Sequence, residues 1–442
     1  MTFKDLNLST PFLNALEDLG ITNPTTIQKN AFSPIMAGKD VMGIAQTGTG
    51  KTFAYLLPLL RQWKFAKQRN PEIIVIVPTR ELVAQVVEEA QKLCKYTSIE
   101  VTGVYGGTNI KTQMQAIAKG VDVVVATPGR LLDLLLNTSI SAKYIKKVVI
   151  DEVDEMLNLG FRTQLKTIFD LFPHKKQLLL FSATITDDVQ ELINYSFNSP
   201  EKIEAAPTGT PLENIEQIAY SVPNYTTKIN FLEYLLSRDK TMTKVLVFAA
   251  SKRLADDIHE RIEEKFPDQL AVIHSNKAQN TRFKTVADFE KGTSRILIAT
   301  DLIARGLDVS SVSHVINMDV PAVPENYIHR IGRTGRADKK GIAITFISAR
   351  DKENRIKVES LMGRTLLLQD LPDEVVISKV LTPEEMPQVH MKIIEVKKPK
   401  VVPKGTSHHE KIAKNKKVNI KVSREDAKKK KYGKRYRKEH RG

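Results

Sequence analysis

The stretch Ala45 to Thr52, Ala-Gln-Thr-Gly-Thr-Gly-Lys-Thr, constrains the fold more than any other part of the sequence. It follows the apolar run Val41 to Ala45 and precedes a helical-looking segment, Phe53 to Leu60. A phosphate-binding loop needs this order of strand, glycine-rich turn and helix, because its backbone N–H groups point at phosphate oxygens and the helix N-terminus adds a favourable dipole. An ordinary glycine-rich turn is the alternative, but an intact Gly-Lys-Thr in this context favours a nucleotide site.

Each residue type in this loop has a physical role in holding phosphate. Gly48 and Gly50 let the main chain approach a ligand without Cβ clashes. Lys51 is expected to reach the β- and γ-phosphates of ATP, and Thr52 to hold Mg²⁺ through its hydroxyl. The expected nucleotide-binding residues of the loop are Thr47, Gly48, Thr49, Gly50, Lys51 and Thr52.

Apolar runs recur after this loop and alternate with helical stretches, at residues 73–77, 121–126, 148–150 and 178–181. Continuous apolar strands of this kind indicate a parallel sheet that is covered on both faces. A polar cluster follows each run directly, and in open α/β sheets ligands bind beyond the carboxyl ends of the strands. The four clusters, at residues 78–82, 127–130, 151–154 and 182–184, therefore predict one site on one edge of the sheet.

The alternation breaks at residues 200–211, which read as a linker, and restarts at 244–249. No second Gly-Lys-Thr occurs, so we predict two similar α/β lobes of which only one carries a phosphate loop. The predicted organisation is a nucleotide-binding domain at 1–206, a linker at 207–214, a second domain at 215–380, and a C-terminal extension with a disordered basic tail at 381–442.

The net charge of +16 lies almost entirely in the tail, because residues 391–442 hold 20 Lys and Arg against 5 Asp and Glu. Such a composition cannot build a core, and we expect this polycation to tether RNA; a solubilising end is the alternative.

A single cysteine, Cys94, excludes a disulfide framework and fits a reducing compartment. With no signal peptide and no membrane-spanning run, we expect a cytoplasmic monomer without membrane contacts.

Further candidates lie around the phosphate loop. The pattern at residues 4–20 predicts an amphipathic helix that ends at Gly20. Gln28 follows this helix, and the amide of Gln28 matches the N6/N7 edge of adenine. The alternative is that Gln28 is a solvated helix residue. Asp151 is expected to bind Mg²⁺ and Glu152 to orient or deprotonate the attacking water, unless both are merely exposed carboxylates.

Two arginines of the second lobe are candidates for the same reaction. Arg333 and Arg336 lie three apart in a glycine-punctuated segment. Arginines supplied across a cleft stabilise charge on the transferring phosphate, which would make hydrolysis depend on closure of the lobes. Pairing with acidic surface residues is the alternative.

Together these residues resemble a DEAD-box ATP-dependent RNA helicase of superfamily two, over roughly residues 3 to 370. The resemblance implies tandem RecA-like domains and an adenine-reading motif at Phe3 and Gln28. It implies that Asp308 contacts the ribose and that Ser182, Thr184, Asp154 and His329 couple the ATP site to unwinding. It places RNA phosphate and sugar contacts at Thr79, Arg80, Gly107, Thr127, Arg130, Arg282 and Thr300.

The sequence departs from the family pattern at three positions. Motif II reads Asp-Glu-Val-Asp, with Val153 for the usual alanine, and we expect this valine to be tolerated if it packs into the lobe. Ile21 stands where an aromatic residue often stacks on adenine, and Thr26 replaces a proline. Two other functions remain open. An ATP-gated clamp that holds RNA without unwinding it shares every one of these motifs, whereas the Gln28 motif and the arginine pair disfavour a DNA translocase.

Overall fold

A computed structural model describes residues 2–46, 48–66, 70–205, 214–301, 312–335 and 340–386. The chain divides into two units, Met1–Met386 and Pro387–Gly442. Within the second unit only residues 423, 424, 426, 427, 430 and 431 are described, and there Ser423 Oγ donates a hydrogen bond to Asp426. The predicted linker lies mostly outside the described residues. Among the described helices, none has the length and apolarity needed to cross a membrane.

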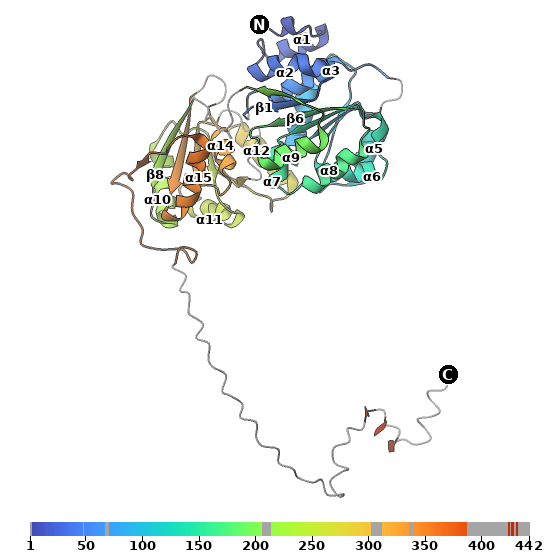
Figure 1. Ribbon diagram of the computed structural model, residues 1–442. Helices are drawn as coiled ribbons and strands as arrows, with labels where there is room; N and C mark the ends of the chain where they lie inside the picture. The colour runs from blue at the N-terminus through green and yellow to red at the C-terminus, as the bar shows by residue number, and fades with distance from the viewer. Residues whose placement is uncertain are drawn as a thin grey trace. The chain divides into compact units, whose positions relative to one another are not determined.

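The part of the chain before the linker, here the first lobe, is built on one parallel sheet, in which Figure 1 labels β1 and β6. The strand order of this sheet is β3-β4-β2-β5-β6-β1-β7. Its strands are β1 Val41–Ile44, β2 Ile73–Ile76, β3 Val101–Val104, β4 Val123–Ala126, β5 Lys147–Asp151, β6 Gln177–Ser182 and β7 Glu201–Glu204. Its helices are α1 Thr10–Asp18, α2 Thr26–Met36, α3 Lys51–Arg61, α4 Arg80–Leu93, α5 Ile110–Ala118, α6 Pro128–Leu136, α7 Val153–Asn158, α8 Arg162–Leu171 and α9 Asp187–Ser196, with 3₁₀ turns at Phe3–Leu6 and Ala142–Tyr144.

Residues 214–386, here the second lobe, repeat this architecture with the order β10-β11-β9-β12-β13-β8-β14. Its strands are β8 Ile215–Ser221, β9 Val245–Phe248, β10 Leu270–Ile273, β11 Ile296–Ala299, β12 His314–Asn317, β13 Gly341–Ile347 and β14 Leu368–Gln369. Its described helices are α10 Tyr225–Arg238, α11 Lys252–Ile262, α12 Gln279–Glu290, α14 Pro324–Ile331 and α15 Lys352–Met362, with a 3₁₀ turn at Ala349–Asp351.

Each strand of the second sheet takes the place that the strand seven earlier holds in the first sheet. The central strands β2, β4 and β9 are buried along their whole length, as strands covered on both faces must be. Each lobe accordingly has two apolar clusters, one on each face of its sheet. The predicted pair of doubly wound parallel sheets is therefore confirmed.

The predicted helix over residues 4–20 is wrong in its extent. The structure instead has the 3₁₀ turn Phe3–Leu6, a left-handed Asn7 with φ of 52°, and α1, which begins at Thr10. Pro11 fits the observed start, because it has no N–H to donate to a preceding turn and is favoured in the first turn of a helix.

Candidate functional site

The glycine-rich turn between β1 and α3 has the backbone geometry that a phosphate loop needs. Gly48 and Gly50 have φ of 80° and 86°, in the left-handed region that a side chain disfavours. A methyl group at Gly50 would lie 2.3 Å from Gln28 Nε2, so only glycine fits there. Thr49 Oγ1 donates to the Gln46 carbonyl at 2.7 Å and closes the turn. Thr47 lies outside the described residues.

Lys51, the first residue of α3, has a buried ammonium with no hydrogen-bond partner among the described residues. A buried cation without a partner is costly, which indicates that this side chain is arranged for an anion. It borders a cavity of about 350 Å³, a size typical of small-ligand sites. Eight of the predicted residues line this cavity together: Gln28, Gly48, Gly50, Lys51, Thr52, Asp151, Glu152 and Arg333.

Asp151 ends β5 and is held at both carboxylate oxygens. Oδ1 accepts from the Glu152 backbone N–H and Oδ2 from the Tyr55 hydroxyl, each at 3.0 Å. Burial raises the pKa of Asp151 to about 6, although the nearby Lys51 ammonium opposes the increase. Carboxylate and hydroxyl oxygens are suitable Mg²⁺ ligands, so Asp151 with Thr52 fits a bound magnesium ion.

Glu152 has a backbone conformation that is unusual for its residue type. Its φ of 55° and ψ of 48° are left-handed, at the N-cap of α7. Such strain costs on the order of 1–3 kcal/mol and persists where the surroundings fix the residue, often at functional sites. Its buried Oε2 has no hydrogen-bond partner in the described part of the chain, so it can still accept from a water in the cavity. Val153 next to it is fully buried in the first lobe.

The two adenine-motif residues lie in different environments. Gln28 Oε1 accepts from Thr25 N at 2.9 Å, and Nε2 donates to the Gly50 carbonyl at 3.1 Å. The amide thus caps α2 and ties it to the phosphate loop, while a second hydrogen and a second lone pair remain for a ligand. Phe3 is buried in the apolar core of the first lobe and does not line the cavity, whereas Ile21 does.

The four predicted coupling residues meet in one buried polar cluster. Asp154 Oδ2 accepts from Thr184 Oγ1 at 2.8 Å and from Thr184 N at 3.2 Å. Ser182 Oγ donates to the Thr184 carbonyl at 2.7 Å. His329 Nε2, from α14 of the second lobe, lies 3.7 Å from Asp154 Oδ2. Burial alone would raise the pKa of Asp154, but His329, Lys51 and Thr184 together hold it well below its usual value.

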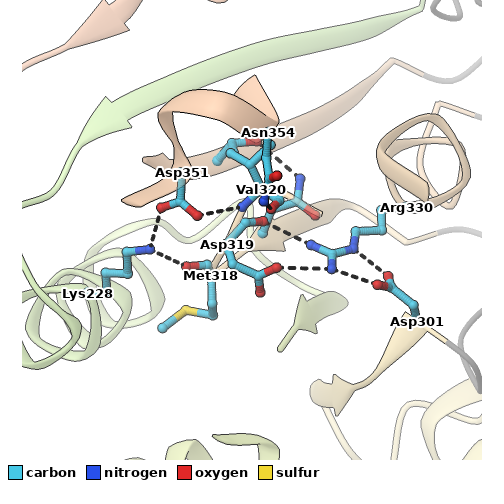
Figure 2. A network of polar contacts seen from close by, with 10 residues as sticks. Lys228, Asp301, Met318, Asp319, Val320, Arg330, Asp351 and Asn354 are labelled. Carbon is cyan, nitrogen blue, oxygen red and sulfur yellow. Dashed lines mark hydrogen bonds and ion pairs between the residues drawn. The ribbon is translucent and has the colours of Figure 1, made fainter. Parts of the chain in front are cut away.

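Arg330 anchors α14, the helix that leads to Arg333. Figure 2 shows its guanidinium between Asp301 and Asp319, with a further bond to the Asp319 carbonyl at 2.9 Å. These carboxylates raise the pKa of Arg330 even though burial opposes the increase. One turn further along, Arg333 Nε donates to the His329 carbonyl at 3.3 Å, and Arg333 reaches the nucleotide cavity. Arg336 and Asp308 lie outside the described residues.

A second cavity of about 550 Å³ brings together most of the predicted RNA contacts. Thr79, Arg80, Thr127, Arg130 and Arg282 line it. Thr79 Oγ1 caps α4 by accepting from Leu82 N at 3.2 Å. Gly107 has φ of 79°, and a methyl group there would lie 2.3 Å from Arg80 Nη1, so it lies against this cluster. Thr300 directly follows β11 and is not part of the cavity wall.

Sequence reasoning gave no role to two residues that join the lobes at this cavity, Glu81 of the predicted cluster at 78–82 and Gln279. Glu81 Oε1 lies 2.5 Å from Arg282 Nη2 and accepts from Gln279 Nε2 at 2.8 Å. Gln279 Oε1 in turn accepts from Arg80 Nη1 at 3.2 Å. Burial lowers the pKa of Arg282, and the Glu81 carboxylate opposes this shift. The only hint in the sequence was the acidic Glu81 beside Arg80. Its partners, Gln279 and Arg282, lie about two hundred residues further along the chain.

Comparisons with known proteins agree with this geometry. Residues 25–192 match the DEAD/DEAH box helicase family, and residues 227–338 match the helicase conserved C-terminal domain. The chain is 38% identical to the DEAD-box ATP-dependent RNA helicase RhpA of Helicobacter pylori, over 84% of this chain and 74% of that protein. It is 37% identical to the ATP-dependent RNA helicase RhlB of Pseudomonas syringae, over 84% of this chain and 95% of that protein. The structure of S. cerevisiae Dbp5 bound to RNA and ADP BeF₃ superimposes with a TM-score of 0.76 at 29% identity, covering 84% of this chain and 95% of that one.

Proposed function

Because this chain belongs to the DEAD-box ATP-dependent RNA helicases, we propose that its first cavity hydrolyses ATP and its second binds the RNA that is unwound. The protein is an RNA-stimulated ATPase and RNA helicase. The observation that carries the assignment of the first cavity is the buried, unpartnered Lys51 ammonium, which faces Asp151 and Glu152 of its own lobe and Arg333 of the other.

At the nucleotide site each side chain has a distinct task. Lys51 neutralises the β- and γ-phosphates, and Glu152 orients the attacking water through its free Oε2. Arg333 stabilises the charge that develops on the transferring phosphate. Thr52 and Asp151 would hold Mg²⁺, which supplies further neutralisation of phosphate charge when it is bound.

Coupling between the lobes follows from the Asp154 cluster. Asp154 belongs to the nucleotide lobe, and its 3.7 Å contact with His329 joins it to the helix that positions Arg333. We therefore expect ATP hydrolysis to occur only when α14 is docked against the first lobe, which makes turnover dependent on closure.

RNA is expected to bind in the second cavity through its phosphates and sugars. The arginines and threonines there recognise backbone atoms, so binding should tolerate any sequence. Contacts to the 2′-hydroxyl would distinguish RNA from DNA. The domain boundaries at 206/207, 214/215 and 380/381, a cytoplasmic monomer, and an RNA-tethering tail remain part of this proposal.

Two assays test the proposal. Lys51→Ala should abolish RNA-stimulated ATP turnover, because the phosphates lose their cation; near-normal turnover would remove the assignment of the phosphate loop. Strand displacement of a short RNA duplex, measured with ATP and with a non-hydrolysable analogue, separates a helicase from an RNA clamp. Stimulation by DNA equal to that by RNA would favour a translocase instead.

A further inference from the structure

The hydroxyl of Tyr55 lies beside both residues proposed to hold magnesium. It donates a hydrogen bond to Asp151 Oδ2 at 3.0 Å, and the Thr52 side chain also interacts with it. Thr52 and Tyr55 are three residues apart on α3, a spacing that places two side chains on the same face of a helix. Asp151 comes from the end of β5, so this one hydroxyl links the phosphate-loop helix to the acidic strand end.

Tyr55 is rigid enough to position its neighbours. Its side chain is fully buried in the core of the first lobe, and its ring centroid lies 5.3 Å from that of Phe181. The other oxygen of Asp151 is held by the Glu152 backbone, so the carboxylate is restrained from both sides. Each carboxylate oxygen keeps a lone pair for a ligand, because each accepts only one of these bonds.

We propose that Tyr55 is a positioning residue for the magnesium site: its hydroxyl fixes the orientation of Asp151, and through it the affinity for the metal–nucleotide complex. This inference rests on the proposed ATPase function. A phenylalanine would fill the same core volume, so packing does not require the hydroxyl. The competing explanation is that Asp151 only satisfies a buried tyrosine, in which case the bond supports folding but not metal binding.

The test compares wild type with Tyr55→Phe, which removes one oxygen and leaves the ring in place. The dissociation constant of a fluorescent ADP analogue is measured in excess Mg²⁺ and in EDTA with the full chain. Their ratio reports how much the metal contributes to nucleotide binding, independently of turnover. Loss of a residue that orients a metal ligand typically costs 10–100-fold in metal affinity or activity. We expect the ratio to fall about tenfold in Tyr55→Phe, while binding in EDTA stays within about twofold.

Tyr225→Phe is the matched control, because Tyr225 is also buried and donates to a carboxylate, Asp257 Oδ2, at 2.7 Å in the second lobe. Its ratio should equal that of wild type. An unchanged ratio in Tyr55→Phe, or equal weakening with and without Mg²⁺, would overturn the positioning role. If magnesium has no effect on wild-type affinity, the proposed metal site itself fails, and the inference about Tyr55 fails with it.

Discussion

Replacing Glu81 with glutamine tests the polar contact that joins the lobes at the RNA cavity. The Glu81 and Arg282 side chains are only 4% and 9% exposed, so solvent screens their 2.5 Å contact weakly. Arg282 Nε has no hydrogen-bond partner among the described residues, which leaves it available to a phosphate while Glu81 holds Nη2. We therefore expect Glu81 to orient Arg282 toward a bound RNA phosphate, in addition to pairing with it.

The expected loss of RNA affinity follows from the chemistry of the Glu81→Gln substitution. Glutamine keeps an accepting oxygen and removes the negative charge, so Glu81→Gln converts the ion pair with Arg282 into a hydrogen bond in which only the arginine is charged. That difference is roughly 1–2 kcal/mol, which corresponds to about tenfold in affinity. Each lobe has its own core, so the loss should affect RNA binding across the lobes more than the unfolding of either lobe.

A double-mutant cycle with Glu81→Gln and Arg282→Gln measures this coupling. RNA affinity is read by fluorescence anisotropy in a non-hydrolysable ATP analogue. We expect a coupling energy of about 1.4 kcal/mol, well above the scatter of about 0.5 kcal/mol for independent sites. A matched cycle on Arg130 and Asp133, whose 3.7 Å pair leaves Asp133 61% exposed, should give less than about 0.5 kcal/mol. Additive effects at Glu81 and Arg282, or tighter binding in Glu81→Gln, would refute the reasoning.

Four further changes have defined outcomes. Glu152→Gln should bind ATP and hold RNA longer without hydrolysis, and rapid RNA release from this variant with ATP intact would contradict the coupling. Arg333→Ala should lower the ATPase rate about a thousandfold, as loss of an arginine finger does, and a loss under about threefold would indicate a structural role. Burial raises the pKa of Asp151 to about 6 in the folded, nucleotide-free protein against an ordinary value of 3.8, so the contribution of Asp151 to stability in EDTA should fall by about 2 kcal/mol as the pH rises from 4 to 8. Asp151→Asn should lack this decline in thermal melts, and an identical pH profile in both proteins would contradict it. Deleting residues 397–442 should keep the maximal ATPase rate but raise the RNA concentration for half-stimulation and flatten the dependence of log affinity on log salt; equal slopes would assign the tail another role.

The sequence predicted the sheets and the gathering of polar residues at one cavity of the first lobe, because both depend on local patterns. Continuous apolar runs fix buried parallel strands, and each polar cluster follows its own strand directly. The contacts that orient these residues were not predictable in the same way. Tyr55 reaches Asp151 across 96 positions, and Gln279 reaches Glu81 across 198. The sequence around Tyr55 or Gln279 does not indicate which residue each one contacts, because only the folded structure brings these distant segments together.

The shared strand order raises the question of why only one lobe would bind nucleotide. In the second lobe β8 leads into α10 as β1 leads into α3. There the helix N-terminus is occupied by the chain itself: Asn224 Oδ1 accepts from Thr227 N at 2.9 Å, and Glu385 Oε1 accepts from Tyr225 N at 2.6 Å.

The Asn224 amide and the Glu385 carboxylate thus each satisfy one of the backbone donors that would otherwise face a phosphate, and the helix dipole favours the carboxylate there. Lys228, the buried lysine of this helix, donates to Asp351 and to the Met318 carbonyl (Figure 2). Lys51 of the first lobe lacks such partners within the described residues. The same topology therefore fills the N-terminus of α10 with the protein's own side chains, whereas Lys51 at the N-terminus of α3 has no such partner among the described residues. We accordingly expect the second lobe to supply Arg333 to the site instead of binding ATP itself.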